Sequence, residues 1–212
     1  MKRPTYVTDK ALKQFIKSAL EEDIQSGDHS TLSTIPSDLM QSAKLLVKED
    51  CILAGVELAE IIFKTFDKNL KIEVFIKDGE NAKVGDIAFI VTGKAQSILS
   101  TERLVLNCMQ RMSGIATLTH DWDSRLIGTK TKLLDTRKTT PNFRICEKWA
   151  VSIGGGTNHR YGLYDMIMLK DNHIDYNGSI TNAVKMTQQY LKKNKLNLKV
   201  EVETRNLAEV EE

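Results

Sequence analysis

Regularly spaced strand ends are the feature of this sequence that most constrains its fold. In the second half of the chain, apolar runs at residues 132–134, 166–169 and 198–202 lead into charge, and Lys138, Lys170 and Glu203 follow them 32 and 33 residues apart. An apolar run followed at once by charge is typical of a buried strand whose carboxyl end opens into a site. A strand–helix–strand unit takes roughly 30 residues or more, so this spacing predicts a parallel α/β array.

The alternation of the last strand favours a barrel over an open sheet. Lys199, Glu201 and Glu203 share one face of this strand, and Val200 and Val202 share the other. In a barrel the apolar face packs on outer helices and the charged face lines the interior, whereas an open sheet would bury both faces. A complete (β/α)₈ barrel takes about 250 residues, and the second half has room for about three units. We therefore expect a fragment, or a half-barrel that lacks its later strands.

The first half of the chain has the pattern of an α+β domain. Apolar periodicity predicts helices at 9–22, capped by Thr8, at 56–66 and at 98–112, with strands at 43–48, 72–76 and 87–91. Ser113-Gly114 is expected to end the third helix, before another that runs through Leu126. The predicted boundary lies near residues 108–116. It gives an N-terminal α/β sandwich domain over 1–112 and an α/β barrel domain over 113–212, with helices near 143–150 and 180–191.

Composition excludes several classes of protein. The chain has 212 residues, of which 41% are hydrophobic and 27% charged, and its net charge of +2 is too small to indicate a nucleic-acid partner. Its three cysteines have no paired spacing, which argues against a disulfide framework or a zinc site and fits a reducing compartment. No apolar run approaches the ~20 residues of a membrane span, and the N-terminus lacks a signal-peptide core. We expect a cytoplasmic protein without a membrane partner.

Cationic side chains follow each of the apolar runs. A further apolar run, at 150–153, leads into "GGGTNHR", and we also interpret it as a strand. Arg137, Lys138, Arg160 and Lys170 would meet an anion at the carboxyl ends of parallel strands. Solvated loop cations are the alternative interpretation. "GGGTNHR" is not a phosphate-binding P-loop, because it lacks G-K-[ST]. On these residues alone we infer an enzyme that handles a small polyanion.

Lys170 is the strongest of these signals. A lysine at the end of an apolar strand needs an anionic partner if it is buried. Glu203 could supply that partner, or it could hold Mg²⁺ together with ligand phosphates. Both alternatives stay open on the sequence.

Several motifs in register extend this interpretation. "DTRKTTPNFR", "GGGTNHR", "LKDNH" and "VEVET" closely resemble quinolinate phosphoribosyltransferase, the carboxylating nicotinate-nucleotide pyrophosphorylase. "TERLVLNCMQRMSGIAT" resembles that family's helix entering the barrel, and "EEDIQSGDHST" its N-terminal signature. The resemblance implies a homodimer with an N-terminal α/β sandwich and an incomplete α/β barrel. It also implies Mg²⁺-dependent transfer of phosphoribose from phosphoribosyl pyrophosphate to quinolinate, yielding nicotinate mononucleotide, carbon dioxide and pyrophosphate for NAD biosynthesis.

The resemblance also implies which residues bind the substrate. Arg137 and Arg160, with Arg103 from the neighbouring subunit, correspond to the binders of the quinolinate carboxylates. Thr136 and His159 correspond to other residues of the same pocket.

Three further residues correspond to the catalytic ones. Lys138 and Lys170 resemble the contacts to phosphoribosyl pyrophosphate and pyrophosphate, and Glu203 resembles the carboxylate near the ribose and the metal. Cations beside the leaving pyrophosphate and a carboxylate beside an oxocarbenium-like sugar are what this chemistry calls for.

Two alternatives to this function remain. The family's later strand-end Asp and the glycine-rich loops that hold the 5′-phosphate are missing here, so the chain alone could be inactive, or a non-catalytic anion-binding module if naturally short. A nicotinate phosphoribosyltransferase is the other alternative, but its substrate has one carboxylate fewer, and the three arginines, Arg103, Arg137 and Arg160, argue against it.

Overall fold

A computed structural model of the protein describes residues 2–212. Contacts divide the chain into two compact units, one ending at His159 and the other beginning at Arg160. Each unit has its own arrangement of helices and strands, which is described separately below. No helix of the described residues is long and apolar enough to cross a membrane.

The first unit begins with two helices before its sheet. α1 (Asp9–Ile24) matches the predicted helix, and the Thr8 hydroxyl accepts a hydrogen bond from the Ala11 N–H at 3.2 Å, which confirms the predicted cap. Sequence analysis missed α2 (His29–Thr34), which is capped by Asp28 and lies within an apparently polar connection. A helix of six residues is too short to show an apolar period.

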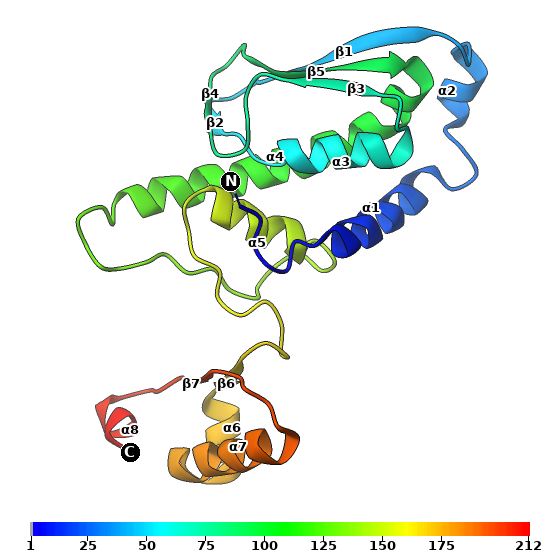
Figure 1. Ribbon diagram of the computed structural model, residues 1–212. Coiled ribbons are helices and arrows are strands. Elements are labelled where there is room, and N and C mark those ends of the chain that lie inside the picture. The colour runs from blue at the N-terminus through cyan, green and yellow to red at the C-terminus, as the bar shows by residue number, and fades with distance from the viewer. Residues whose placement is uncertain (1) are drawn as a thin grey trace. The chain divides into compact units, whose positions relative to one another are not determined.

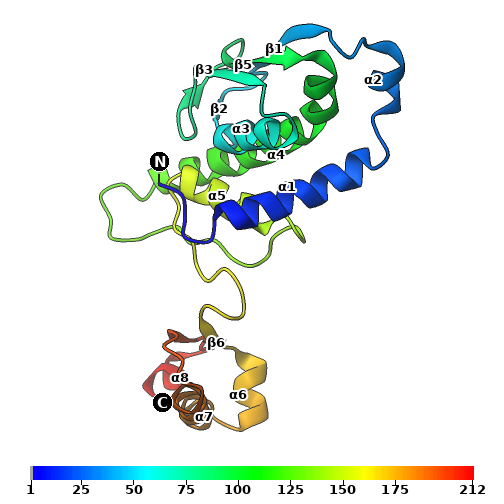
Figure 2. The same ribbon diagram turned by 45° about the vertical axis from the view of Figure 1, so that its right-hand side comes forward.

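A three-stranded antiparallel sheet forms one layer of this unit. Its order is β1 (Met40–Leu46), β5 (Ile87–Lys94) and β3 (Lys71–Val74), and β2 (Cys51–Ile52) pairs separately with β4 (Asn81–Ala82). The helices α3 (Val56–Phe66) and α4 (Ala95–Ser124) cover one face of the sheet. α1 and α5 (Arg144–Ile153) lie on the far side of those two helices (Figures 1 and 2). The buried core therefore lies between the sheet and these helices.

Helix α4 differs from its prediction. It continues without a break from Ala95 to Ser124, so the expected interruption at Ser113-Gly114 is wrong. Ser113 is buried inside the helix, and its hydroxyl bonds to the backbone of Ala54, accepting from N–H at 3.0 Å and donating to C=O at 3.2 Å. A serine that looks like a helix breaker therefore connects α4 to the β2–α3 loop.

The second unit contains the predicted parallel strands. β6 (Ile167–Leu169) pairs in parallel with β7 (Val200–Val202), and α6 (Asp171–Asn177) and α7 (Ile180–Asn194) form the crossover between them. α8 (Leu207–Glu211) follows. Met168 lies opposite Glu201 in the register, so these two side chains lie on the same face of the strand pair.

Two expected strands of the second half do not form as predicted. At 132–134 the structure has a single parallel bridge, between Leu134 and Thr157. The apolar run 150–153 is the last turn of α5, where Ala150 and Ile153 are buried, and not a strand. A short apolar run does not distinguish a strand from a buried helix segment. The α/β class, with an N-terminal sheet domain and a C-terminal α/β domain, is confirmed. The division at residue 112 remains a prediction.

Candidate active site

A buried ion pair holds the residue that directly precedes the predicted anion-binding residues 136–138 in the sequence. The side chain of Lys148, 1% exposed, pairs with the carboxylate of Asp135, which is 7% exposed. Asp135 also accepts hydrogen bonds from the His159 backbone N–H at 2.8 Å and from the Asn158 side-chain amide at 2.7 Å. Because three donors meet one buried carboxylate, its negative charge is compensated where water is excluded.

Backbone pairing brings the same two segments side by side. The Asp135 N–H donates to the Thr157 carbonyl at 3.2 Å, and the Thr157 N–H donates to the Leu133 carbonyl at 2.8 Å. Residues 136–138 and His159 therefore emerge from neighbouring segments that run in the same direction. The structure thus places Thr136, Arg137 and Lys138 on the segment that neighbours His159.

Arg137 has an unsatisfied donor. Thr136 and Lys138 are exposed, whereas Arg137 is half-buried, and its Nε is buried without a hydrogen-bond partner among the described residues. A buried N–H without an acceptor costs about 1–3 kcal/mol, so an acceptor at this position would be favourable. A carboxylate, with two oxygens in one plane, matches the guanidinium fork.

Glu147 of α5 fixes the far end of the same loop. Its carboxylate, 7% exposed, accepts hydrogen bonds from the Thr140 N–H at 3.0 Å and hydroxyl at 2.9 Å. Arg111 of α4 donates to it from Nε at 3.0 Å and from Nη2 at 2.9 Å. Burial raises the pKa of Glu147, but the hydrogen bonds from Thr140 and Arg111 outweigh it, and the net pKa lies below the usual glutamate value.

The second unit carries a pair of opposite charges at its strand ends. The Lys170 ammonium, directly after β6, lies 2.6 Å from the Glu203 carboxylate, directly after β7. Glu203 is thus the anionic partner of Lys170, as the sequence suggested, but Lys170 is not a buried lysine. The lysine is 44% exposed and the glutamate 58%, so the pair is accessible to a ligand. Arg160 is half-buried, and its guanidinium donates to the Met166 carbonyl at 3.4 Å.

The predicted site residues thus form two groups. The first unit contains those at 136–138 and 159, and the second unit contains Arg160, Lys170 and Glu203. Arg103 is distant in the sequence from both groups. Arg103 lies on an exposed position of α4.

The carboxylates near these cations are too few to surround a metal ion with protein ligands alone. Among residues 2–212, no group of three or more His, Cys, Asp or Glu side chains could hold a metal ion. Mg²⁺ is usually held by one or two carboxylates, with substrate phosphates and water as its other ligands. The exposed carboxylate of Glu203 fits that mode.

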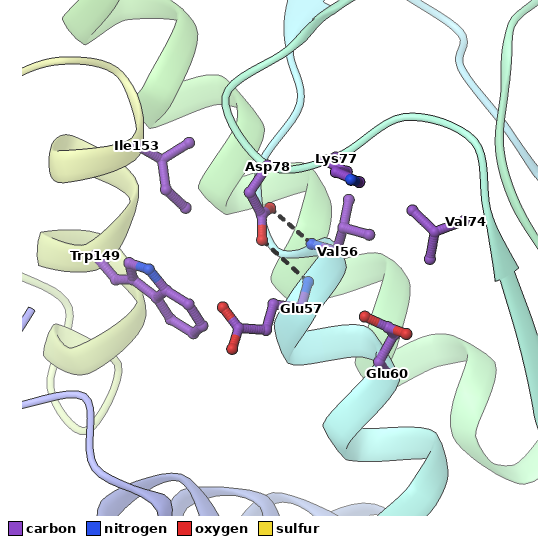
Figure 3. A pocket seen from close by; sticks show the side chains of 8 residues that line it. All are labelled: Val56, Glu57, Glu60, Val74, Lys77, Asp78, Trp149 and Ile153. Atoms are coloured by element: carbon purple, nitrogen blue, oxygen red, sulfur yellow. Dashed lines mark hydrogen bonds between the residues drawn. The ribbon is translucent and has the colours of Figure 1, made fainter. Parts of the chain in front are cut away.

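A separate acidic pocket of about 330 Å³ lies in the first unit, between α3, the end of β3 and α5. In Figure 3, the Asp78 carboxylate accepts hydrogen bonds from the N–H groups of Val56 at 2.8 Å and Glu57 at 3.0 Å. Burial raises the pKa of Asp78, and burial also raises the pKa of Glu60 on the same wall. Asp78 therefore caps α3, and the pocket contains none of the predicted site residues.

Sequence analysis missed the residues that support the site. Asp135, Lys148, Asn158 and Glu147 were not singled out. The available signal was the pair Glu147-Lys148 within the otherwise apolar run "RICEKWAVSI", because charged residues on the buried side of a helix need partners.

The sequence patterns of two known domains match almost the whole chain. The N-terminal domain of quinolinate phosphoribosyl transferase matches residues 28–113, and its C-terminal domain matches residues 115–212. An Arabidopsis thaliana nicotinate-nucleotide pyrophosphorylase [carboxylating], chloroplastic, is 50% identical over 99% of this chain and 59% of its own length. A tobacco quinolinate phosphoribosyltransferase [decarboxylating] is 49% identical over 99% of this chain. The chain spans 58% of that relative's length.

Solved structures agree with these sequence matches. NadC from Streptococcus pyogenes is 38% identical, with a TM-score of 0.89 over 98% of this chain and 73% of its own. The nicotinate-nucleotide pyrophosphorylase from Francisella tularensis is 36% identical, with a TM-score of 0.87 over 100% of this chain and 73% of its own. On both the sequence and the fold, the chain belongs to the quinolinate phosphoribosyltransferase family.

Proposed function

We propose that the native protein transfers phosphoribose from phosphoribosyl pyrophosphate to the ring nitrogen of quinolinate, releasing pyrophosphate and carbon dioxide and forming nicotinate mononucleotide for NAD biosynthesis. The observation that carries the proposal, beside family membership, is the accessible Lys170–Glu203 pair at the ends of adjacent parallel strands. A cation and a carboxylate so close together suit a reaction whose transition state carries positive charge on one group and negative charge on another.

The proposed roles follow from how the charges move. The quinolinate nitrogen attacks C1′ of the sugar while the bond from C1′ to the pyrophosphate oxygen breaks. Positive charge then develops on the sugar, where Glu203 stabilises it, and negative charge develops on pyrophosphate, where Lys138 and Lys170 stabilise it. When the bond from ring carbon 2 to its carboxylate breaks, the cationic ring nitrogen draws in the electron pair. Carbon dioxide leaves, and a proton takes its place on the ring carbon.

Recognition of quinolinate rests on arginine and on His159. Two substrate carboxylates need more than one planar fork, and Arg137 and Arg160, with Arg103 of the partner subunit, are the proposed binders. The unsatisfied Nε of Arg137 supports this role. Thr136 and His159 complete the proposed pocket. Mg²⁺, when bound, would supply charge neutralisation at the phosphate oxygens, and Glu203 is the residue that fits as its protein ligand.

A homodimer is part of the same proposal. Arg103 is exposed on α4, and the same helix exposes apolar side chains of Leu99, Leu118 and Trp122. Exposed apolar groups on one helix suit a protein partner, and a second copy of the chain is the partner that the family resemblance implies. A cytoplasmic location is supported by the three free cysteines, although the plant relatives' names include chloroplastic and mitochondrial.

The test is an assay of the native-length protein with phosphoribosyl pyrophosphate, Mg²⁺ and either quinolinate or nicotinate. We expect release of pyrophosphate and carbon dioxide in equal amounts when quinolinate is the second substrate, and no release when nicotinate is. The variant Lys170→Ala should lose about 10²-fold or more in turnover, since it removes a charge at the leaving group. Lys185→Ala, an exposed lysine of α7, is the matched control and should behave as the unmodified protein.

Other outcomes would select the alternatives. Pyrophosphate release with nicotinate and not quinolinate would favour a nicotinate phosphoribosyltransferase. Binding of quinolinate in isothermal titration without any pyrophosphate release would favour a non-catalytic anion-binding module.

A further inference from the structure

We propose that Asn158 is a positioning residue that sets the geometry of the quinolinate pocket. Tyr6, from the N-terminal segment, completes the set of hydrogen bonds to the Asn158 side chain. The inference rests on the proposed function for its kinetic consequence, and on the structure alone for the arrangement itself. Tyr6, Asp135, Lys148, Ser152 and Asn158 are called the Asp135 network below.

The side-chain amide of Asn158 is fully used. Its Nδ2 donates to the Asp135 carboxylate and to the Lys148 carbonyl, each at 2.7 Å. Its Oδ1 accepts from the Ser152 hydroxyl at 2.7 Å and from the Tyr6 hydroxyl at 2.8 Å. An amide has two N–H donors and two acceptor positions, so all four are occupied. No other side chain of this size offers that set, and aspartate would put a second carboxylate against Asp135.

The network connects the two parts of the predicted pocket in this unit. Asn158 directly precedes His159, whose backbone N–H donates to the same Asp135 carboxylate at 2.8 Å. Asp135 directly precedes residues 136–138, which include Arg137. The position of His159 relative to Arg137 therefore depends on this carboxylate and on the groups that orient it, in addition to the backbone pairing of Asp135 with Thr157.

Helix α5 provides the rigid side of the network. Lys148 and Ser152 are four residues apart and lie on the same face of the helix. Lys148 is almost wholly buried and cannot leave Asp135 without exposing an unpaired charge to the protein interior. Groups fixed by such contacts lose little freedom on binding a ligand, which is how preorganised sites gain rate.

Tyr6 is the contact least expected from sequence order. It lies 152 residues before Asn158, in the segment that precedes α1, and it packs against the buried core. Its hydroxyl is the only part of the side chain that bonds to Asn158, so Tyr6→Phe removes that bond and keeps the ring packing. Ser152 still donates to the same oxygen, which predicts a mild effect rather than collapse.

The experiment compares Tyr6→Phe and Asn158→Ala with Tyr190→Phe, an exposed tyrosine of α7, as the matched control. In the native-length protein we expect Tyr6→Phe to lower kcat/KM for quinolinate about threefold to tenfold, and Asn158→Ala about tenfold to a hundredfold. KM for phosphoribosyl pyrophosphate should stay within about twofold for Tyr6→Phe, and its melting temperature should stay near that of the control. A merely structural role would lower the melting temperature and leave the kinetics of the folded fraction unchanged.

Hydrogen–deuterium exchange of the peptide around His159 provides a readout that needs no turnover. Asn158→Ala should accelerate exchange at the His159 amide about tenfold or more, because its acceptor Asp135 loses one of the two side chains that orient it. Accelerated exchange in a protein that does not transfer phosphoribose would support the network and overturn the proposed function. Unchanged exchange in Asn158→Ala, or unchanged kcat/KM for quinolinate in Tyr6→Phe, would overturn the positioning role. If Asn158→Ala does not fold, Tyr6→Phe decides the question.

Discussion

Glu201 of β7 and Glu203, which follows the strand, differ in what surrounds them. Glu203 follows the strand directly, its backbone N–H donates to the Leu169 carbonyl at 2.8 Å, and its carboxylate meets Lys170. Glu201 lies two residues earlier, about 6.6 Å along the strand, opposite Met168. A carboxylate at the strand end is the one that can reach a bound sugar or its metal. We therefore propose Glu203, and not Glu201, as the carboxylate that takes part in the reaction.

We predict that Glu203→Gln lowers turnover about 10²–10³-fold in the native-length protein, because it removes a charge that faces the developing cation. Its melting temperature should change little, since exposed ion pairs contribute roughly 0–1 kcal/mol. Glu201→Gln is the neighbouring comparison and should retain most of the turnover. Steady-state kinetics and thermal melting of both variants provide the check. Loss of turnover in Glu201→Gln with full activity in Glu203→Gln would reverse the assignment.

A pH dependence of stability should arise from Glu147. The pKa of this carboxyl lies below its usual value in the folded protein, because the hydrogen bonds from Thr140 and Arg111 outweigh the effect of burial. A lowered folded pKa means that the stabilisation is fully present above the ordinary pKa of 4.5 and is lost as the pH falls through the folded value.

We therefore expect Glu147→Gln to reduce the free energy of unfolding by about 1–3 kcal/mol at neutral pH, since it loses charge-assisted bonds. The difference from the unmodified protein should shrink as the pH falls below 4.5. Urea unfolding between pH 3 and pH 7 measures this, with Glu73→Gln on the exposed side of β3 as the control. A difference that stays constant over this range would show that the Glu147 charge makes no contribution.

At the scale of elements, sequence patterns predicted the helices and strands whose formation depends on nearby residues. The helix at 56–66 is predicted to the residue, and the 32- and 33-residue intervals predict the parallel pairing of β6 with β7. Apart from the short helix α2, two failures occurred where a partner distant in the sequence decides the structure. Ser113 bonds to Ala54 and so stays within α4, and the run 150–153 is buried as a helix against α4.

The same limit applies to the candidate site. The residues proposed to bind the substrate lie in local motifs, so Arg137, Lys138 and Lys170 could be proposed from the sequence and the resemblance. Among the supporting residues, Glu147 and Lys148 left a signal, as charges in an apolar run, but Tyr6 and Asn158 left none, because the bond between them spans 152 positions. Position along the chain gives no information on which polar groups meet in the interior.

Two glycines provide a matched test of the packing of α5 against α4. A Cβ on Gly154, at the end of α5, would lie 2.3 Å from the Ala116 carbonyl oxygen and 2.8 Å from the Thr119 Cβ, whereas a Cβ on Gly114 would meet nothing within 4 Å. Gly154→Ala should therefore destabilise the protein by about 1–3 kcal/mol, because backbone must move. Gly114→Ala should stabilise it by about 0.5–1 kcal/mol, because alanine favours a helix. Thermal or urea unfolding distinguishes the two, and equal effects would mean that α5 is free to shift away from α4.

At the scale of the whole molecule, the proposed sharing of Arg103 between subunits makes a quantitative prediction. If Arg103 serves the neighbouring subunit's site, each site needs Arg160 from one subunit and Arg103 from the other. Arg103→Ala and Arg160→Ala homodimers should then each lose about tenfold or more in kcat/KM for quinolinate, since each site lacks one charged carboxylate binder.

Mixing the two variants should restore activity if the sharing is correct. In a heterodimer, the subunit that keeps Arg160 receives Arg103 from its partner, so one of the two sites is complete. Complete exchange of an equal mixture gives about half heterodimers, and the restored activity should approach about a quarter of the unmodified protein's. Turnover is measured before and after exchange, with mass spectrometry of the intact dimers to verify mixing. Activity that stays at the homodimer level after verified mixing would mean that Arg103 acts within its own subunit. Full activity of Arg103→Ala by itself would mean that this residue has no part in binding quinolinate.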